Sequence, residues 1–283
     1  MADMQVIKQG ETIEDVILRH SKRGMLTLRE YLPEDYCRAI AAELLRLERG
    51  TVLLTTGFYV AGYAETDGPV GTWALAKALN ELGFRAVIVT DSFCKGFFEP
   101  VGLEVEYVEI EAGAEAYAEI LTKYRPVALV SIERCGRNVN GQYANMRGVV
   151  IDEFTARVDM MFDLARREGI PLFGVGDGGN EIGMGNMRQV ISEKLELTPC
   201  VVEVDHLVIA SVSNWGAYGL CAALQQQTGK AVLPAFAACR DFIAATVAIG
   251  SVDGVTHEMV CSVDGFDMTV EQEILEALAA VVA

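Results

Sequence analysis

A glycine-rich segment carries the residues whose chemistry is easiest to define. Six of the twelve residues from 174 to 185 are glycine, and two acids, Asp177 and Glu181, stand among them. Glycine permits positive φ and close approach of the backbone to a ligand, and successive N–H groups can then stabilise an oxyanion. Paired carboxylates serve acid–base catalysis or hold a hard cation such as Mg²⁺ or Mn²⁺, and both roles stay open here. Further predicted substrate contacts in this segment are Gly178, Gly179 and Asn180.

Arginines gather in a second segment, directly after the apolar run that ends at Ile132. Three arginines and no lysine fall within 15 residues. The planar guanidinium suits a bidentate grip on a carboxylate or phosphate, so this segment predicts an anion site. Glu133, at its start, is a candidate for removing a proton from the substrate. The residues predicted to bind substrate are Arg134, Arg137, Asn145 and Arg147.

Two further segments combine polar residues with the starts of helices. In the first, Asp67 is a candidate for capping the helix that follows or for catalysis. The N-terminus of that helix could also bind an anion through its free N–H groups. In the second, Ser213 is a candidate cap, and Asn214 is predicted to orient a substrate. The remaining predicted substrate contacts are Gly57, Glu65 and Thr66. Asp253 and Asp264 each precede a glycine, which predicts turns, and the sequence assigns them no further role.

Short apolar runs alternate with helical segments along the chain. Continuous β-branched runs between helices indicate an α/β protein, with a mainly parallel sheet covered by helices on both faces. Ligands bind beyond the carboxyl ends of such strands, which is where the four segments lie. The predicted strands are 51–55, 86–90, 104–110, 127–132, 171–175 and 207–212, and the predicted helices include 70–82, 114–124, 154–168, 215–227, 236–248 and 270–282. We expect one compact domain over residues 1–283, with a helical lead-in at 1–50, a core at 51–265 and a C-terminal helix at 266–283.

Composition narrows the classes of partner. The net charge of −17 argues against nucleic acid and anionic membranes, whereas a local arginine cluster still suits a small carboxylate substrate. No apolar run reaches the ~18 residues of a membrane span, and residues 1–11 lack a signal or transit pattern, so we expect a cytoplasmic protein. Seven cysteines without a C-x-x-C spacing predict reduced, mostly buried thiols. A homo-oligomer is compatible with the sequence, which does not set the oligomeric state.

Several familiar catalytic motifs are absent from the sequence. There is no G-x-x-x-x-G-K-[ST], no G-x-S-x-G and no H-E-x-x-H, and none of the three histidines lies in the four segments. Residues 174–179 match the dinucleotide pattern G-x-G-x-x-G, but glycines at 183 and 185 interrupt the helix that this pattern should open. Carboxylates, arginines, asparagines and backbone amides must therefore carry the chemistry.

Five stretches together resemble the D-glutamate cyclase family. They are residues 65–69, 133–137, 145–148, 176–185 and 213–216, in the family's order, within a match from about Thr51 to Asp264. The stretch 176–185 is the most specific of them. The resemblance implies a hydro-lyase that interconverts D-glutamate and 5-oxo-D-proline, in which the α-amine attacks the γ-carboxyl group and water leaves.

The residues suggest roles within that reaction. Arginine forks would hold the two carboxylates, and Asp177 or Glu181 would protonate the leaving oxygen or hold Mg²⁺ or Mn²⁺. Glu133 or Asp67 would accept the proton of the amine. The alternatives are another enzyme for a small carboxylate or phosphate, and a non-catalytic amino-acid sensor. The two acids of the glycine-rich segment favour chemistry over sensing, because acids beside a bound anion would weaken its binding.

Overall fold

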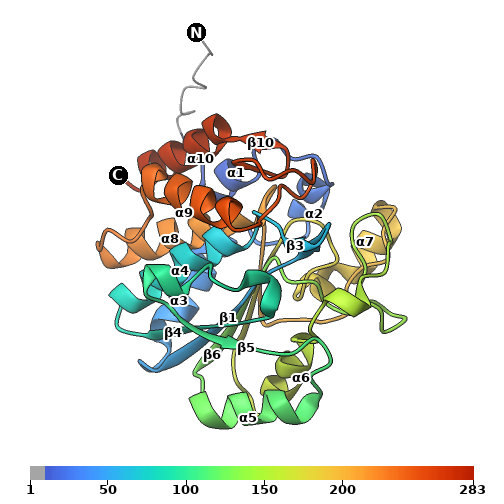
Figure 1. Cartoon of the computed structure of the whole chain (residues 1–283). Coiled ribbons are helices and arrows are strands. Elements are labelled where there is room, and N and C mark those ends of the chain that lie inside the picture. The colour runs from blue at the N-terminus through green and yellow to red at the C-terminus, as the bar shows by residue number, and fades with distance from the viewer. Residues whose placement is uncertain (1–9) are drawn as a thin grey trace.

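The central sheet has six strands, and every hydrogen-bonded pair of neighbours in it is parallel. The structure is a computed structural model that describes residues 10–283 (Figure 1). The strand order is β5-β4-β1-β6-β7-β8. Their bounds are β1 Thr51–Thr55, β4 Arg85–Thr90, β5 Glu104–Tyr107, β6 Ala128–Ile132, β7 Leu172–Gly176 and β8 His206–Ile209. The chain starts at the central strand β1 and adds β4 and β5 on one side. It then crosses to the other side of β1 and adds β6, β7 and β8, so the sheet is doubly wound with its switch point between β1 and β6.

Helices cover both faces of the sheet, as the sequence predicts. One layer, built around α8, contains α1 (Ile13–Ile17), α3 (Tyr36–Arg46), α4 (Pro69–Glu81), α8 (Ser213–Thr228), α9 (Phe236–Ala248) and α10 (Met268–Val281). The other layer contains α5 (Ala114–Tyr124) and α6 (Asp159–Arg167), which pack against each other below the strands in Figure 1. Smaller elements are α2 (Met25–Arg29), α7 (Arg188–Lys194), the hairpin of β2 (Tyr59–Val60) and β3 (Tyr63–Ala64), and the hairpin of β9 (Ser262–Val263) and β10 (Phe266–Asp267).

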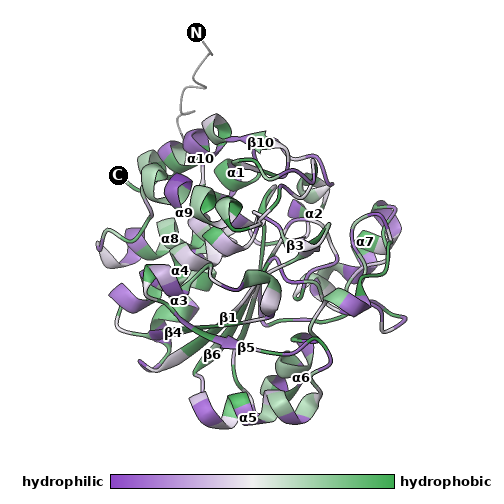
Figure 2. Ribbon diagram, in the orientation of Figure 1, coloured by the Kyte–Doolittle hydropathy of each residue, from purple (hydrophilic) through white to green (hydrophobic). Residues whose placement is uncertain are grey.

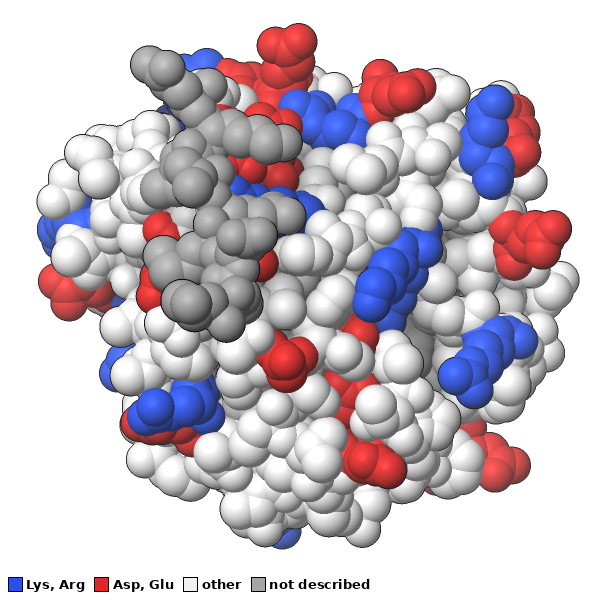
Figure 3. Space-filling model, turned by 90° about the horizontal axis from the view of Figure 1, so that it is seen from above, with Lys and Arg blue, Asp and Glu red and all other residues white. Residues whose placement is uncertain are grey.

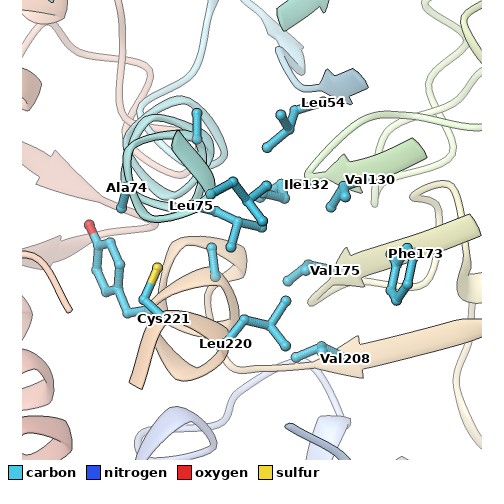
Figure 4. Close-up of a cluster of buried hydrophobic side chains, with 14 of the residues drawn as sticks. Leu54, Ala74, Leu75, Val130, Ile132, Phe173, Val175, Val208, Leu220 and Cys221 are labelled. Carbon is cyan, nitrogen blue, oxygen red and sulfur yellow. The ribbon is translucent and has the colours of Figure 1, made fainter. Parts of the chain in front are cut away.

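The core lies between the sheet and its helices. Figure 4 shows side chains of α4 and α8, such as Leu75 and Leu220, pointing at strand residues that include Ile132 and Val175. All four are fully buried. Figure 2 shows apolar residues along the central strands, with hydrophilic residues placed on the outer helices. Because both faces are covered, β1, β6 and β7 are buried along their whole lengths, which fixes the loops beyond their ends.

Two predicted elements have different bounds in the structure. The predicted strand 104–110 ends at Tyr107, at the sheet edge. The predicted helix 154–168 begins only at Asp159. Thr155 is extended, and the carbonyl of Ala156 accepts a hydrogen bond from Arg134 (2.8 Å), so this stretch serves a tertiary contact instead of a helical turn.

The molecular surface and the thiols agree with the composition. No helix within residues 10–283 combines the length and the apolar character needed to cross a bilayer. All seven cysteines are free and six are buried, which confirms the prediction of mostly buried thiols. Figure 3 shows Lys and Arg dispersed among Asp and Glu on the viewed face, with no continuous basic stripe there.

Glu271 joins α10 to α8 inside the core. Its carboxylate accepts hydrogen bonds from Trp215 Nε1 (2.7 Å) and Tyr218 Oη (2.7 Å), and burial raises its pKa. We expect Glu271→Ala to lower the free energy of unfolding by about 2–4 kcal/mol, because two buried donors lose their acceptor. Glu271→Gln, which keeps one acceptor and one donor, should retain most of the stability. Urea denaturation followed by circular dichroism measures both, and equal losses would contradict this role.

Candidate active site

Loops that bear acidic residues meet beyond the carboxyl ends of the central strands. The loop after β1 carries Glu65 and Asp67, the loop after β6 begins at Glu133, and the loop after β7 carries Asp177 and Glu181. Because β1 and β6 are neighbours at the switch point, these loops converge. The structure thus brings all four predicted catalytic acids and Glu65 to one place.

Six carboxylic acids form a buried cluster there, called the acid cluster below. Its members are Glu65, Asp67, Glu133, Asp177, Glu181 and Asp264, each 6% exposed or less. One carboxylate oxygen each from Asp67, Asp177 and Asp264 lies within 4.8 Å of the other two. The same is true of Glu133, Asp177 and Glu181, so Asp177 belongs to both triads.

Arg23 supplies a cation to the acid cluster. Its Nη1 lies 2.7 Å from Asp177 Oδ1 and its Nη2 lies 2.7 Å from Asp264 Oδ1. It precedes Gly24, whose φ of 81° turns the chain into α2. The sequence analysis singled out neither Arg23 nor a site role for Asp264. A lone arginine in a helical lead-in and an Asp-Gly turn carry no local signal of a ligand site.

Burial raises the pKa of the clustered acids, and repulsion between them adds to the effect. Burial, with the charge of Asp264 beside it, raises the pKa of Asp67 to about 7. The pKa values of Glu65, Glu133 and Asp177 are raised well above their usual range, again mainly by burial. Such groups can exchange protons near neutral pH, or bind a cation that removes their repulsion.

Several oxygens of the site have no hydrogen-bond partner within the described part of the chain. They are Asp177 Oδ2, Glu181 Oε1 and Asn180 Oδ1, all of them buried. A buried polar atom without a partner costs about 1–3 kcal/mol, and more when it is charged. Oxygen atoms of this kind, held close together, are the ligands that Mg²⁺ and Mn²⁺ prefer.

The side chains of Asp67 and Asn214 link the starts of two helices by accepting backbone hydrogen bonds. The carboxylate of Asp67 accepts from the backbone N–H groups of Ser213 (2.9 Å) and Asn214 (2.8 Å), where α8 begins. The side-chain oxygen of Asn214 accepts from the N–H groups of Gly68 (2.9 Å) and Gly71 (2.8 Å), where α4 begins. Asp67 therefore caps α8. The sequence had predicted that it caps α4, the helix that follows it in the chain. Asn214 is fully buried and positions these loops.

Glu133 is held in a sparsely populated backbone conformation. Its φ is 47°, which an L-residue adopts at a cost of about 1–3 kcal/mol. The hydroxyl of Ser213 donates a hydrogen bond to its carboxylate, so Ser213 orients this acid instead of capping α8. The conformation turns the chain abruptly after β6, and Glu133 lines the pocket while the next residue, Arg134, is fully buried.

The glycine-rich segment makes room for a carboxylate. A Cβ on Gly176 would lie 2.9 Å from Glu181 Oε2, and a Cβ on Gly178 would lie 2.6 Å from Glu181 Oε1. Gly179, with φ of 110°, donates its N–H to Glu181 Oε2 (2.8 Å). That amide is thus paired with a side chain of the protein.

A pocket of about 370 Å³ borders the acid cluster. Its polar lining consists of Arg23, Glu65, Glu133, Asn145, Arg147, Asn180 and His257. Five of these were predicted from sequence. Asn145 holds its loop by accepting hydrogen bonds from the backbone of Arg147 (2.9 Å) and Val149 (3.0 Å). The guanidinium of Arg147 makes no hydrogen bond or ion pair with residues 10–283, so it is available to an anion in the pocket.

Arg134 and Arg137 do not reach this pocket. Arg134 is fully buried, pairs with Asp91 (2.6 Å) and donates to the carbonyl of Gly57 (2.7 Å). Arg137 pairs with Asp159 (2.7 Å) and Asp163 (2.9 Å) on α6. Both arginines therefore hold the loop after β6 in place.

Two further predicted contacts also have structural roles. Gly57 has a φ of 100°, and a Cβ there would lie 2.6 Å from Cys94 Sγ, so its backbone turns in a packed space. Thr66 donates its hydroxyl to the carbonyl of Ser262 (2.7 Å) and ties the loop after β1 to β9. That contact brings the hairpin with Asp264 up to the acid cluster.

The fold and the site define a doubly wound α/β protein with a small-molecule pocket beside buried acids at the switch point. The chain belongs to the family described as D-glutamate cyclase-like, C-terminal, whose model matches residues 13–279. It is 34% identical over 199 residues to the human protein named mitochondrial D-glutamate cyclase. That match covers 62% of this chain and 32% of the human protein, so the chain corresponds to about a third of its length.

Solved structures give weaker similarities. A UDP-glucose 4-epimerase from Brucella ovis in complex with NAD is 16% identical, with a TM-score of 0.30 over 64% of this chain and 49% of that one. A UDP-GlcNAc 2-epimerase from Methanocaldococcus jannaschii is 11% identical, with a TM-score of 0.32 over 70% and 49%. Similarities this low carry no inference about a ligand. In this chain the G-x-G-x-x-G pattern leads into turns, and α7 begins only at Arg188.

Proposed function

We propose that this protein is a hydro-lyase that interconverts D-glutamate and 5-oxo-D-proline plus water. The observation that carries the proposal is the acid cluster with its unpartnered carboxylate oxygens, next to a pocket with a free arginine. Family membership and the similarity to a D-glutamate cyclase support the same reaction. The reaction needs a proton acceptor, a means of activating a carboxylate oxygen as a leaving group, and a fixed substrate conformation.

Arg147 is suited to hold the α-carboxylate of the substrate. Its guanidinium lines the pocket on the loop that Asn145 fixes. A guanidinium gives bidentate, charge-assisted hydrogen bonds, which fix orientation as well as position. With that carboxylate held away from the acid cluster, the γ-carboxyl group points toward it, and the α-amine can close a five-membered ring. Intramolecular attack of this kind gains effective molarities of ~10⁵–10⁸ M, so no ATP is required.

Two versions of the chemistry follow from the acid cluster. In the first, Glu133 accepts the proton of the amine, and Asp177 or Glu181 protonates the leaving oxygen. Raised pKa values of these three acids suit such proton transfers. In the second, Glu133, Asp177 and Glu181 would hold Mg²⁺ or Mn²⁺, and Asp67 would accept the amine proton. A cation bound there would polarise the γ-carboxyl group as a Lewis acid.

The charge of the site favours the version with a cation. Within residues 10–283, Arg23 is the one basic residue paired with these six acids, and two triads of carboxylate oxygens each fall within 4.8 Å. Charges buried in this way are normally paired or coordinate a metal. The donors are all oxygens, which suits Mg²⁺ or Mn²⁺ more than zinc.

Proton NMR tests the proposed reaction directly. Protein treated with EDTA would be incubated with 5-oxo-D-proline and, separately, with its L-isomer, each with and without Mn²⁺. Appearance of glutamate from the D-isomer supports the proposal, and its dependence on Mn²⁺ selects the version with a cation. Absence of turnover of both isomers with Mn²⁺ present would refute the proposed reaction. The candidate substrate would then be another small carboxylate or a phosphate.

Loss of Arg147 should act mainly on substrate binding. We expect Arg147→Ala to raise KM about 10- to 100-fold with a smaller change in kcat, because a charge-assisted hydrogen bond is worth ~1.5–3 kcal/mol. Steady-state kinetics on D-glutamate measures the effect. Arg167→Ala, which removes an exposed arginine of α6, is the matched control. Equal KM values for the two variants would exclude Arg147 from the substrate site.

A further inference from the structure

One side of the pocket is apolar in a way that D-glutamate does not explain. This apolar wall consists of Phe58, Tyr59, Val60, Val149 and Ile151. D-Glutamate carries three charged groups on a short chain, and none of them gains from contact with such a wall. The pocket volume of about 370 Å³ also falls in the range of ~300–1,000 Å³ that holds larger ligands.

The apolar wall is fixed by packing except at Val149, which is 56% exposed. Phe58 and Ile151 are 4% and 6% exposed and form a small core with Cys135 and Tyr143. The ring of Tyr59 stacks on Phe154, with centroids 4.3 Å apart and planes at 10°. A wall held in this way remains apolar and in place without a ligand, so it is a preformed surface for an apolar group.

The position of the wall identifies the part of a substrate that it can hold. The acid cluster must contact the γ-carbonyl carbon and the group that leaves from it. A substituent on that leaving group projects away from the reacting carbon, toward the rest of the pocket. A substituent on the α-amine would instead block the nucleophile, and the α-carboxylate is held by Arg147.

We propose that the site also cyclises γ-glutamyl amides of apolar amines, with the amine substituent seated against the apolar wall. This inference rests on the proposed function, because the same α-amine attacks the same γ-carbon. The new bond joins the α-nitrogen to the γ-carbon, and the bond from that carbon to the amide nitrogen breaks. The proton lost by the α-amine is balanced by the proton gained by the leaving amine. The products are 5-oxo-D-proline and a free amine, and neither an oxidant nor water is consumed.

A series of alkylamides tests this activity. The probes are the methyl-, propyl- and butylamides of D-glutamate at the γ-position, whose leaving amines have nearly equal basicity. Proton NMR follows 5-oxo-D-proline and free amine, and D-glutamate is assayed in parallel with the metal-supplemented protein. Each buried methylene strengthens apolar binding by ~fourfold, so we expect kcat/KM to rise at least tenfold from the methyl- to the butylamide, with both products in equal amounts.

The outcomes separate this inference from the proposed function. A flat or falling series, with D-glutamate still cyclised, overturns the inference and leaves the proposed function standing. Failure of D-glutamate and of every amide overturns both. Release of D-glutamate with the amine would indicate hydrolysis by water and also overturns the inference.

A variant of the apolar wall makes the test specific. Val60 is only partly buried on the β2–β3 hairpin, so Val60→Asp adds a charge to the wall without opening the core. The ratio of kcat/KM for the butyl- and methylamides should fall to about one in this variant. Because this ratio is internal to one preparation, it is independent of the fraction of folded protein. A ratio that stays at the wild-type value would show that the alkyl group binds elsewhere.

Discussion

Asp177→Asn is expected to lower the rate of the proposed cyclisation by about 10³-fold or more. Asp177 is the residue shared by both carboxylate triads, and we assign it the proton donor's role in one version of the chemistry and a ligand's role in the other. A proton donor is worth ~10²–10⁴-fold, and loss of a cation ligand acts on the same step. NMR assays of D-glutamate turnover measure the effect. Asp163→Asn, which changes a surface partner of Arg137, is the control and should retain its rate.

The same substitution should not destabilise the metal-free protein. Burial raises the pKa of Asp177 in the folded state. Protonated Asp177 therefore contributes to the stability of the folded protein. This contribution is fully present below the unfolded pKa of ~3.9 and is lost as pH rises through the folded pKa. Asparagine stays neutral at every pH. The thermal midpoint of Asp177→Asn should therefore equal or exceed that of the wild type at pH 8, with a smaller difference at pH 4. A large loss of stability at pH 8 would mean that the Arg23–Asp177 ion pair outweighs burial, and an activity close to wild type would remove Asp177 from the mechanism.

Arg134→Met should cost about 3–5 kcal/mol of unfolding free energy. Its removal leaves Asp91 buried without its cation and frees the carbonyls of Gly57 and Ala156. Breaking one side of a buried ion pair typically has this cost. Guanidinium denaturation gives the value, and the double variant Arg134→Met, Asp91→Asn should recover part of the loss because no buried charge is stranded.

This second prediction also separates two readings of the arginine segment. A structural Arg134 lowers stability and leaves the KM of the folded fraction nearly unchanged. An Arg134 that binds substrate would raise KM with little loss of stability. The latter result would restore the role that the sequence suggested.

The sequence predicted the fold and the meeting of the acidic loops because both depend on local patterns. Apolar runs such as 128–132 read as buried strands, and Glu133 and Asp177 follow two of them directly. Parallel strands present their carboxyl ends at one edge, so residues after consecutive strands must meet. The confirmed parts are the α/β class, the parallel sheet and the helices on both faces.

The roles of individual arginines were not predictable in the same way. Arg134, Arg137 and Arg147 share one segment and one chemistry, yet only Arg147 lines the pocket. Asp91, at the end of another strand, draws Arg134 inward, and α6 supplies the acids that hold Arg137. Partners from distant segments decide which guanidinium stays free, and periodicity carries no information about them.

The site contributions of Arg23 and Asp264, which come from the N- and C-terminal parts of the chain, were missed for a related reason. Arg23 precedes the first strand by two helices, α2 and α3, and Asp264 lies in the turn of a hairpin just before the C-terminal helix. Asp264 has a φ of 53° and serves as a turn residue, as predicted, while its carboxylate also joins the acid cluster. Asp253 has the predicted turn role, because it accepts backbone N–H groups from Val255 and Thr256.

Oxygen exchange from labelled water tests the central claim most directly. D-Glutamate would be incubated in H₂¹⁸O with the EDTA-treated protein, with and without Mn²⁺, and analysed by mass spectrometry with fragmentation. Reversible loss and return of water at the γ-carbon predicts ¹⁸O in the γ-carboxylate and none in the α-carboxylate, for the D-isomer, whatever the equilibrium position. Absence of label in the γ-carboxylate with Mn²⁺ present would contradict the account, because the acid cluster would then not catalyse cyclisation of D-glutamate.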